Sequence, residues 1–330
     1  MRLISKIAGG VLVMTAGFCA VAQAAEPITI KFVHDAIATS PEGQGATLFA
    51  KLVDEQLKGK VKVVVYPNSS LFNVPDGIAA LQAGNIQMIA ADPAKLKGFD
   101  KSMQIYSLPF LFGSIKQVEG FSKSAEGRKL YKPLEKSNLS VLSLWPNGFK
   151  QLTNSVRPIS KPADYKGISF RVVSSGLAAD VFKSQGASAT VIPYNQLYTA
   201  LQQGTVQGFS DPFTDIDNQR FYEVQKYLTI SNQGFLGYLV LTNPGFWNKL
   251  PADIRTKLEQ IMDKVQEHEN ELSVKLNAEA LDHVKKVSKM QITTLNDEQV
   301  AAFKTAFQPL YKKYSPIIGE EYIKAAQAMH

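Results

Sequence analysis

The chain has 330 residues, of which 45% are hydrophobic and 20% charged. This length is enough to bury a sizeable core in one or two globular domains. The formal net charge is +7, and the lysines and arginines are spread along the chain without forming a block. We therefore exclude a nucleic-acid-binding protein and expect a solvated surface that slightly favours anionic solutes.

The first residues have the pattern of a secretory signal peptide. Arg2 and Lys6 form a basic start, and an apolar run that is short for a bilayer span follows as far as Val21. Small residues at Ala22 and Ala24 then match a signal peptidase site. We expect residues 1–24 to be removed, which leaves a charge of 34 − 29 = +5 and an exported, periplasmic protein.

Metal-ligating residues are few and scattered. The single cysteine, Cys19, lies within the predicted signal peptide, and the bulky Phe18 before it argues against a lipoprotein site. The four histidines show no HxxH or HExxH spacing; they are His34, His268, His283 and His330. We therefore expect no metal, no cofactor and no disulfide in the mature protein.

The first part of the mature chain alternates between strand and helix patterns. The expected elements are three strands with two helices between them, in the order Ile28–Val33, Gly43–Leu57, Val61–Tyr66, Asp76–Ala83 and Ile86–Ala90. This order predicts a mainly parallel sheet covered by helices. Ligands of such sheets bind beyond the carboxyl ends of the strands.

The same order returns later in the chain. The second set of elements is Ile168–Val173, Gly176–Gln185, Ala189–Ile192, Asn195–Gln203 and Val206–Ser210. Two further strands, Tyr227–Ile230 and Phe235–Thr242, are predicted to cross between the two units, and a helix over 252–286 is long enough to brace both. The sequence therefore predicts an α/β protein with two lobes and a cleft between them.

Arg171 is the most unusual residue of the second unit. Side chains alternate along a strand, so Ile168, Phe170 and Val172 share one face and Arg171 lies on the other. A guanidinium is rarely buried without a partner. The residues alone leave three alternatives: water at an exposed sheet face, a structural carboxylate, or a ligand.

Catalytic patterns are absent. No nucleophile elbow, P-loop or dinucleotide fingerprint is present, and no pair of residues combines a nucleophile with a base. Asp92 and Asp211 each precede a proline at a strand end, where a carboxylate can bind a ligand or serve as an ordinary turn or cap residue. These residues suggest recognition and not reaction, so we do not expect an enzyme.

Five segments in a fixed order carry a family resemblance. They are LPFLF at 108–112, NGFKQLTN at 147–154, PADYKG at 162–167 leading to Arg171, YTALQQG at 198–204 and FYEVQKYL at 221–228. With these segments the sequence resembles the solute-binding proteins of tripartite ATP-independent periplasmic (TRAP) transporters over essentially the whole mature chain.

The resemblance implies a fold of the two-lobed periplasmic-binding-protein type. Lobe I would comprise 25–147 and about 237–276, and lobe II would comprise 148–236 and about 277–330. It also implies a monomeric receptor that closes on a small organic acid and delivers it to the membrane permease subunits. Two alternatives stay open: a receptor that signals to a partner protein, and a secreted lyase that uses Asp92 or Asp211 as base.

For the site, the resemblance implies that Arg171 forms a bidentate salt bridge with a ligand carboxylate. Lys150 stands where the family commonly has an arginine, and Asp211 where it commonly has an asparagine. An ionised Asp211 only accepts hydrogen bonds, so we expect it to prefer a hydroxyl, an ammonium or Lys150. With Asp92 the pocket becomes nearly neutral, which favours a monocarboxylate with hydroxyl or amino groups over a simple dicarboxylate.

Aromatic residues near these positions are further candidates. Trp145, Phe149, Tyr194 and Phe209 could form walls that stack on a ligand, or could belong to the core. Asp35, after the first strand, and Gln233, near the crossing strands, are additional candidates for the cleft.

Overall fold

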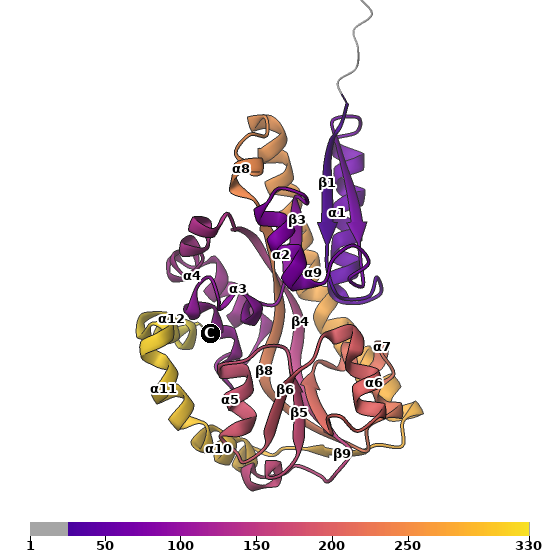
Figure 1. Cartoon of the computed structure of the whole chain (residues 1–330), viewed down its shortest axis with the longest axis vertical. Coiled ribbons are helices and arrows are strands. Elements are labelled where there is room, and N and C mark those ends of the chain that lie inside the picture. The colour runs from indigo at the N-terminus through magenta and orange to yellow at the C-terminus, as the bar shows by residue number, and fades with distance from the viewer. Residues whose placement is uncertain (1–25, 330) are drawn as a thin grey trace, which may run out of the picture.

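A single mixed sheet runs through the molecule (Figure 1). The computed structural model describes residues 26–329, so the predicted signal peptide lies outside the described residues. The strands follow the order β2-β1-β3-β8-β4-β7-β5-β6, and β9 pairs with β8. Their bounds are β1 Ile28–Val33, β2 Val61–Tyr66, β3 Met88–Ala91, β4 Ser140–Asn154, β5 Ser169–Val172, β6 Ser188–Val191, β7 Gly208–Asp211, β8 Tyr227–Thr242 and β9 Gln291–Thr294.

Helices flank the sheet (Figure 1). Their bounds are α1 Pro41–Gln56, α2 Val74–Gln82, α3 Ile115–Lys123, α4 Ala125–Tyr131, α5 Leu177–Lys183, α6 Leu197–Gln202, α7 Phe213–Asn218, α8 Pro244–Trp247, α9 Ala252–Val287, α10 Asp297–Ala306, α11 Gln308–Ile318 and α12 Glu320–Ala328. No helix within residues 26–329 combines the length and the apolar character that a membrane span requires.

The two predicted β-α-β-α-β units are confirmed. Strand β1 pairs in parallel with β2 and β3, and β5 pairs in parallel with β6 and β7. The units are not two separate sheets, however. Strand β8 runs antiparallel to β3, strand β4 runs antiparallel to β7, and β4 and β8 run antiparallel to each other. They join the parallel sets into one α/β architecture with two lobes.

The crossing strands differ from the sequence prediction. Strand β8 is one continuous strand where two were predicted, and β4 was not predicted at all. Pro146, Asn147 and Gly148 are residues typical of a turn, but here a register shift between Pro146 and Gly148 keeps them within the ladder with β8. Bulges of this kind allow a strand to contain residues that would otherwise end it.

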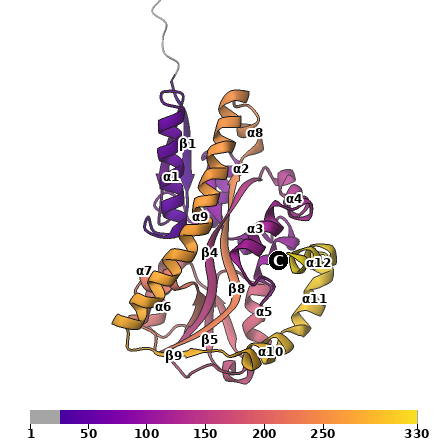
Figure 2. The ribbon, with the colours of Figure 1, turned by 180° about the vertical axis from the view of Figure 1, so that it is seen from behind.

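The predicted bracing helix is confirmed as α9. Its apolar residues recur at helical spacing and are buried; they are Ile254, Leu258, Ile261, Met262 and Val265. Seen from behind, α9 runs diagonally along the molecule past α1, β4 and α7 (Figure 2), and it contacts all three. This one helix therefore contacts elements of both predicted lobes.

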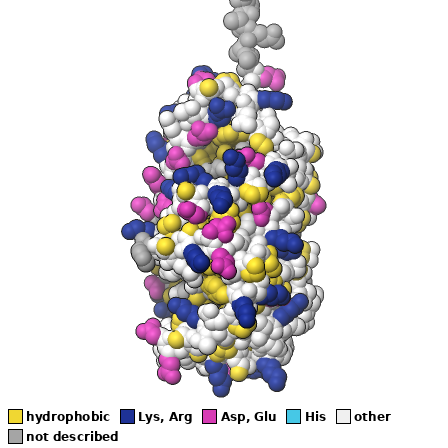
Figure 3. Space-filling view, turned by 90° about the vertical axis from the view of Figure 1, so that its left-hand side faces the viewer, with side chains coloured by type: hydrophobic (Ala, Val, Ile, Leu, Met, Phe, Trp, Pro, Cys, Tyr) yellow, Lys and Arg dark blue, Asp and Glu magenta, His cyan; other side chains and the backbone are white. Residues whose placement is uncertain are grey.

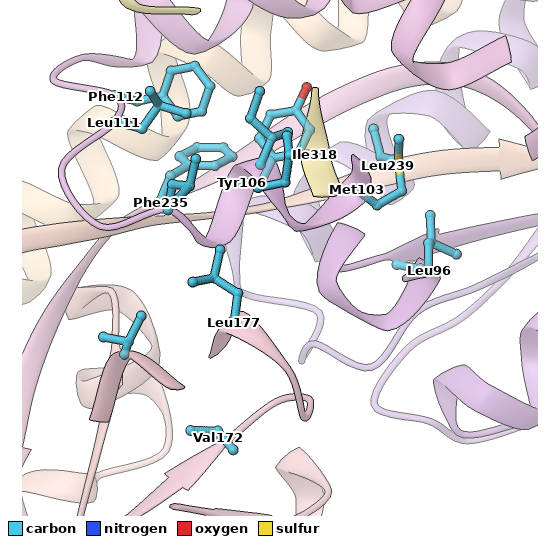
Figure 4. Close-up of a cluster of buried hydrophobic side chains, with 14 of the residues drawn as sticks. Leu96, Met103, Tyr106, Leu111, Phe112, Val172, Leu177, Phe235, Leu239 and Ile318 are labelled. Carbon is cyan, nitrogen blue, oxygen red and sulfur yellow. The ribbon is translucent and has the colours of Figure 1, made fainter. Parts of the chain in front are cut away.

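One hydrophobic cluster joins segments from both halves of the chain. Val172 from β5 and Leu177 from the start of α5 belong to the same cluster as Tyr106 and Phe235, and Leu177 lies between Val172 and the two aromatic rings (Figure 4). The last helices extend this cluster, because α11 packs against α5 and the 101–107 segment while α12 packs against α3 and α4. The C-terminal helices were expected in lobe II, but they contact α5 of lobe II and also α3 and α4 of lobe I. The lobe boundaries expected from the sequence therefore remain a prediction.

The charges on the surface are mixed. On the face shown in Figure 3, lysine and arginine side chains alternate with aspartate and glutamate, and no large area has one sign. This distribution agrees with the solvated surface expected from the sequence.

Candidate functional site

Three cavities meet at Arg171. The basic cavity has about 490 Å³ of empty space and is lined by residues that include Lys150, Arg171, Ser210 and Gln233. The acidic cavity has about 310 Å³ and is lined by Asp35, Asp92, Lys95, Arg171, Val173, Tyr194, Asp211, Asp215, Leu236 and Tyr238. The outer cavity lies between residues 69–76 on one side and 191–195 on the other, and Arg171 lines it as well.

Arg171 is buried in β5, with 4% of its surface exposed. Its Nε donates to the Ile192 carbonyl oxygen at 3.0 Å, and its Nη1 donates to Asp211 Oδ2 at 3.2 Å. The guanidinium also lies over the Tyr194 ring, 5.8 Å from its centroid. Of the alternatives left by the sequence, an exposed sheet face is wrong and a structural carboxylate is present. Nη2 bonds to none of residues 26–329 and can still donate to a ligand.

Asp211 ends β7 and is 1% exposed. Among the described residues its ion-pair partner is Arg171 on the parallel strand β5, and not Lys150, which was one of the three partners expected from the sequence. Burial raises the pKa of Asp211, while the charges of Arg171 and Lys150 act to lower it. The Asp211 carboxylate thus occupies part of the guanidinium fork that, by the family resemblance, was expected to bind a ligand.

Asp35 and Asp92 follow β1 and β3 and line the acidic cavity. Asp35 Oδ2 accepts from Lys95 Nζ at 2.6 Å. Burial alone would raise the pKa of Asp35, but Lys95 holds it below its usual value. Asp92 Oδ1 accepts from the backbone N–H of Ala94, which is the cap role that the sequence left open. Its other carboxylate oxygen is buried without a hydrogen-bond partner.

Asp215 is a site residue that the sequence analysis missed. Asn147 Nδ2 donates to both of its oxygens, at 3.2 and 3.1 Å, and the Tyr194 hydroxyl donates to Oδ1 at 3.2 Å. Burial, and then the charge of Asp211, raise the pKa of Asp215 to about 8. The signal was its position four residues after Asp211, in the first turn of the helix that follows β7.

Lys150 and Gln233 come from the crossing strands β4 and β8. Both line the basic cavity with Arg171. The Gln233 side-chain oxygen accepts from the Tyr165 hydroxyl at 2.6 Å, which orients its amide group. Lys150 Nζ forms no ion pair with the described residues 26–329, so its charge is available to an anion.

The aromatic candidates separate into different environments. Tyr194 lines the acidic and outer cavities. Phe149 lines another cavity, with Phe213 and Val274, away from Arg171. Trp145 and Phe209 are fully buried in hydrophobic clusters, where Trp145 contacts Phe32 and Phe209 contacts Phe221. Trp145 and Phe209 thus belong to the hydrophobic core, which is one of the two alternatives that the sequence left open for them.

No group of three or more potential metal ligands is close enough together within residues 26–329 to hold a metal ion. His34 is buried beside the acidic groups, and burial lowers its pKa to about 4, so it stays neutral at pH 7. The described site therefore consists of carboxylate, lysine and arginine side chains around the three cavities that meet at Arg171. Such a site is suited to binding a charged organic solute.

Comparisons with known proteins agree with this geometry. The family described as bacterial extracellular solute-binding protein, family 7, matches residues 32–316. A C4-dicarboxylate-binding periplasmic protein DctP from Rhodobacter capsulatus is 34% identical, with 92% of this chain and 91% of that protein covered.

Two solved structures have the same architecture. A TRAP periplasmic solute-binding protein from Shewanella oneidensis with bound succinate has a TM-score of 0.89 and 32% identity, covering 92% of this chain and 99% of its own. The sugar acid binding protein DctPAm from Advenella mimigardefordensis, in complex with galactonate, has a TM-score of 0.88 and 29% identity over the same shares. The chain belongs to family 7 of the bacterial extracellular solute-binding proteins, the solute receptors of TRAP transporters.

Proposed function

We propose that this protein binds a small organic acid between its lobes, through Arg171, and delivers it to the membrane permease subunits of a TRAP transporter. The observation that carries the proposal is the position of Arg171. It is buried at the point where three cavities meet, and its Nη2 group has no bond to residues 26–329.

The ligand carboxylate would lie between Arg171 and Lys150 in the basic cavity. Two cationic groups favour an anion there, and Gln233 lies at the same wall. The relatives support an acid as the solute, since the Shewanella protein binds succinate and the Advenella protein binds galactonate. The extra acids in this cleft favour a monocarboxylate with hydroxyl or amino groups.

Closure of the cleft would trap the acid. The outer cavity separates residues 69–76 from residues 191–195, which belong to the proposed lobes I (25–147 and about 237–276) and II (148–236 and about 277–330). Contacts that a ligand makes with both sides exist only in the closed state and would stabilise it.

The remaining parts of the proposal concern location and role. Residues 1–24 would act as a cleaved signal peptide that sends the protein to the periplasm, where it would work as a monomer and as a receptor without catalytic activity. The periplasmic location of the Rhodobacter relative supports this.

The test is a thermal-shift screen of organic acids, including succinate and galactonate, followed by calorimetry. A ligand that binds only the folded protein raises its melting temperature. We expect at least one acid to do so in the wild-type protein and not in Arg171→Ala. Uptake of that acid should then be lost in a deletion strain. Chemical conversion of the bound acid, or shifts that are unaffected by Arg171→Ala, would contradict the proposal.

A further inference from the structure

The cleft has opposite charges on the two sides of Arg171. The described residues that line the basic cavity include Lys150 and Arg171 but no aspartate or glutamate. Those that line the acidic cavity include four aspartates together with two bases, Lys95 and Arg171. A ligand that fills both cavities therefore meets positive charge at one end and negative charge at the other.

The bases of the acidic cavity are already paired. Lys95 Nζ lies 2.6 Å from Asp35 Oδ2, and Arg171 Nη1 lies 3.2 Å from Asp211 Oδ2. These two pairs leave Asp92 and Asp215 without a basic partner among the described residues. Within the described residues, no base neutralises Asp92. Asp215, whose pKa burial raises to about 8, is a second carboxyl group that a cation in the cavity would ionise.

Two buried carboxylate oxygens have no hydrogen-bond donor. Asp92 Oδ2 and Asp211 Oδ1 have no partner among residues 26–329, although the two residues are only 6% and 1% exposed. Both residues line the acidic cavity. A buried acceptor without a donor is costly, and an ionised carboxylate can only be satisfied by a group that donates.

The chemistry of the missing donor is restricted by its surroundings. A second carboxylate on the ligand would lie among like charges, and the described residues offer no metal site that could bridge them. A hydroxyl group would satisfy one oxygen but leave the excess negative charge. An ammonium group donates several hydrogen bonds and also supplies the opposite charge.

We propose that the solute is an amino-bearing carboxylic acid, whose carboxylate lies between Arg171 and Lys150 and whose ammonium group lies against Asp92, Asp211 and Asp215. This inference rests on the proposed function of the cleft and narrows the class of solute. Tyr194 supports the arrangement, because its ring lies beneath the Arg171 guanidinium while its hydroxyl holds Asp215. The same side chain thus links the two ends of the site.

The test uses acids that share a chain length and differ only in the far group. For unbranched chains of three to six carbons, the purified protein is titrated with the ω-amino acid, the ω-hydroxy acid and the dicarboxylic acid, for example 4-aminobutyrate, 4-hydroxybutyrate and succinate. At one chain length or more, we expect the amino acid to bind at least about tenfold more tightly than its two counterparts.

Two variants locate the effect. Asp92→Asn and Asp215→Asn preserve the shape of the side chain. The first removes a carboxylate, and the second removes a carboxyl group that is protonated below pH 8 in the free protein and would ionise beside the ammonium group, so each should reduce the preference for the amino acid to about threefold or less. Asp253→Asn is the matched control, because its side chain is 71% exposed and lies outside the three cavities. That control should keep the wild-type preference.

The inference and the proposed function fail in different ways. A dicarboxylic or hydroxy acid that binds as tightly as the amino acid at every chain length, and that depends on Arg171, overturns the inference and leaves the receptor function standing. A preference for the amino acid that persists in both aspartate variants also overturns the inference. If no member of the series and neither succinate nor galactonate binds, both are overturned.

Discussion

Arg171 and Asp211 form a buried ion pair across two parallel strands, with Nη1 and Oδ2 3.2 Å apart and both side chains at most 3% exposed. The pair leaves Nη2 of the guanidinium and Oδ1 of the carboxylate without partners among residues 26–329. One side of the pair can therefore donate to an anion, and the other can accept from a donor. This arrangement makes the two residues the centre of the candidate site.

Removal of the Arg171 side chain should weaken ligand binding. Arg171→Ala should raise the dissociation constant of the acid found by thermal shift by an amount equivalent to about 2–5 kcal/mol, because a buried carboxylate loses its partner. Arg171→Lys keeps the charge and loses the planar fork, so it should recover only part of the affinity. Calorimetry measures both. Lys58→Ala is the control, because Lys58 is exposed and lies outside the cavities, and it should leave the dissociation constant unchanged. Unchanged affinity in Arg171→Ala would remove Arg171 from the site.

Loss of the Asp211 charge should destabilise the fold. Asp211→Ala leaves the buried guanidinium without its carboxylate, so the free energy of unfolding should fall by about 3–5 kcal/mol. Asp211→Asn should cost less, since the amide oxygen can still accept from Arg171. Urea denaturation provides the measurement. The control is Glu55→Ala, whose exposed pair with Lys51 should contribute about 0–1 kcal/mol; equal losses for Asp211 and Glu55 would refute a special role for the buried pair.

The stability of the protein should depend on pH through Asp215. Its pKa is raised to about 8 in the folded protein, so the folded state binds more protons than the unfolded state between pH 4 and 8. Stability is then greatest at low pH in this range and is lost as pH rises toward 8. The raised pKa values of Glu42 and Glu269, caused first by burial, act in the same direction.

His34 changes the pH dependence of stability in the direction opposite to Asp215, but over a lower pH interval. Its pKa is lowered from 6.5 to about 4, so its contribution to stability rises only up to about pH 6.5. Between pH 6.5 and 8 we therefore expect the free energy of unfolding to fall, with about 1–2 kcal/mol of the change due to Asp215. Denaturation at several pH values measures the slope, which should be smaller in Asp215→Asn. An identical slope in wild type and variant would show that Asp215 is ionised throughout.

The contact between α1 and α9 should not tolerate a side chain at Gly45. A Cβ atom there would lie 2.4 Å from the Glu269 Oε1 atom, and Glu269 is buried. Gly45→Ala should lower the free energy of unfolding by about 1–3 kcal/mol, although alanine is the better helix former. Gly98→Ala, where a Cβ meets no atom within 4 Å, is the control.

The same contact can be tested by a second change. The double variant Gly45→Ala with Glu269→Ala should lose less stability than the sum of the single changes, because the shortened side chain gives the new methyl group room. Thermal and urea unfolding of the four proteins measure this coupling. Additive losses would mean that the two residues do not limit the approach of α1 and α9.

The sequence alone determined the local elements and the unusual place of Arg171. Strands β1, β2 and β5 and the long helix α9 were predicted within a few residues, because hydrophobic periodicity is a local property of the chain. Alternation along β5 put Arg171 on the face opposite Phe170 and Val172. Asp92 was likewise recognised, as a residue at a strand end that could either cap or bind.

Only the tertiary structure decided which groups meet. Strand β4 was missed because Pro146 and Gly148 indicate a turn when read locally, and the neighbouring strand β8 keeps them extended. Arg171 and Asp211 are 40 residues apart, and Asn147 and Asp215 are 68 residues apart. No spacing in the sequence encodes such contacts, because the order of strands in the sheet brings the residues together and burial then sets their charge and their partners.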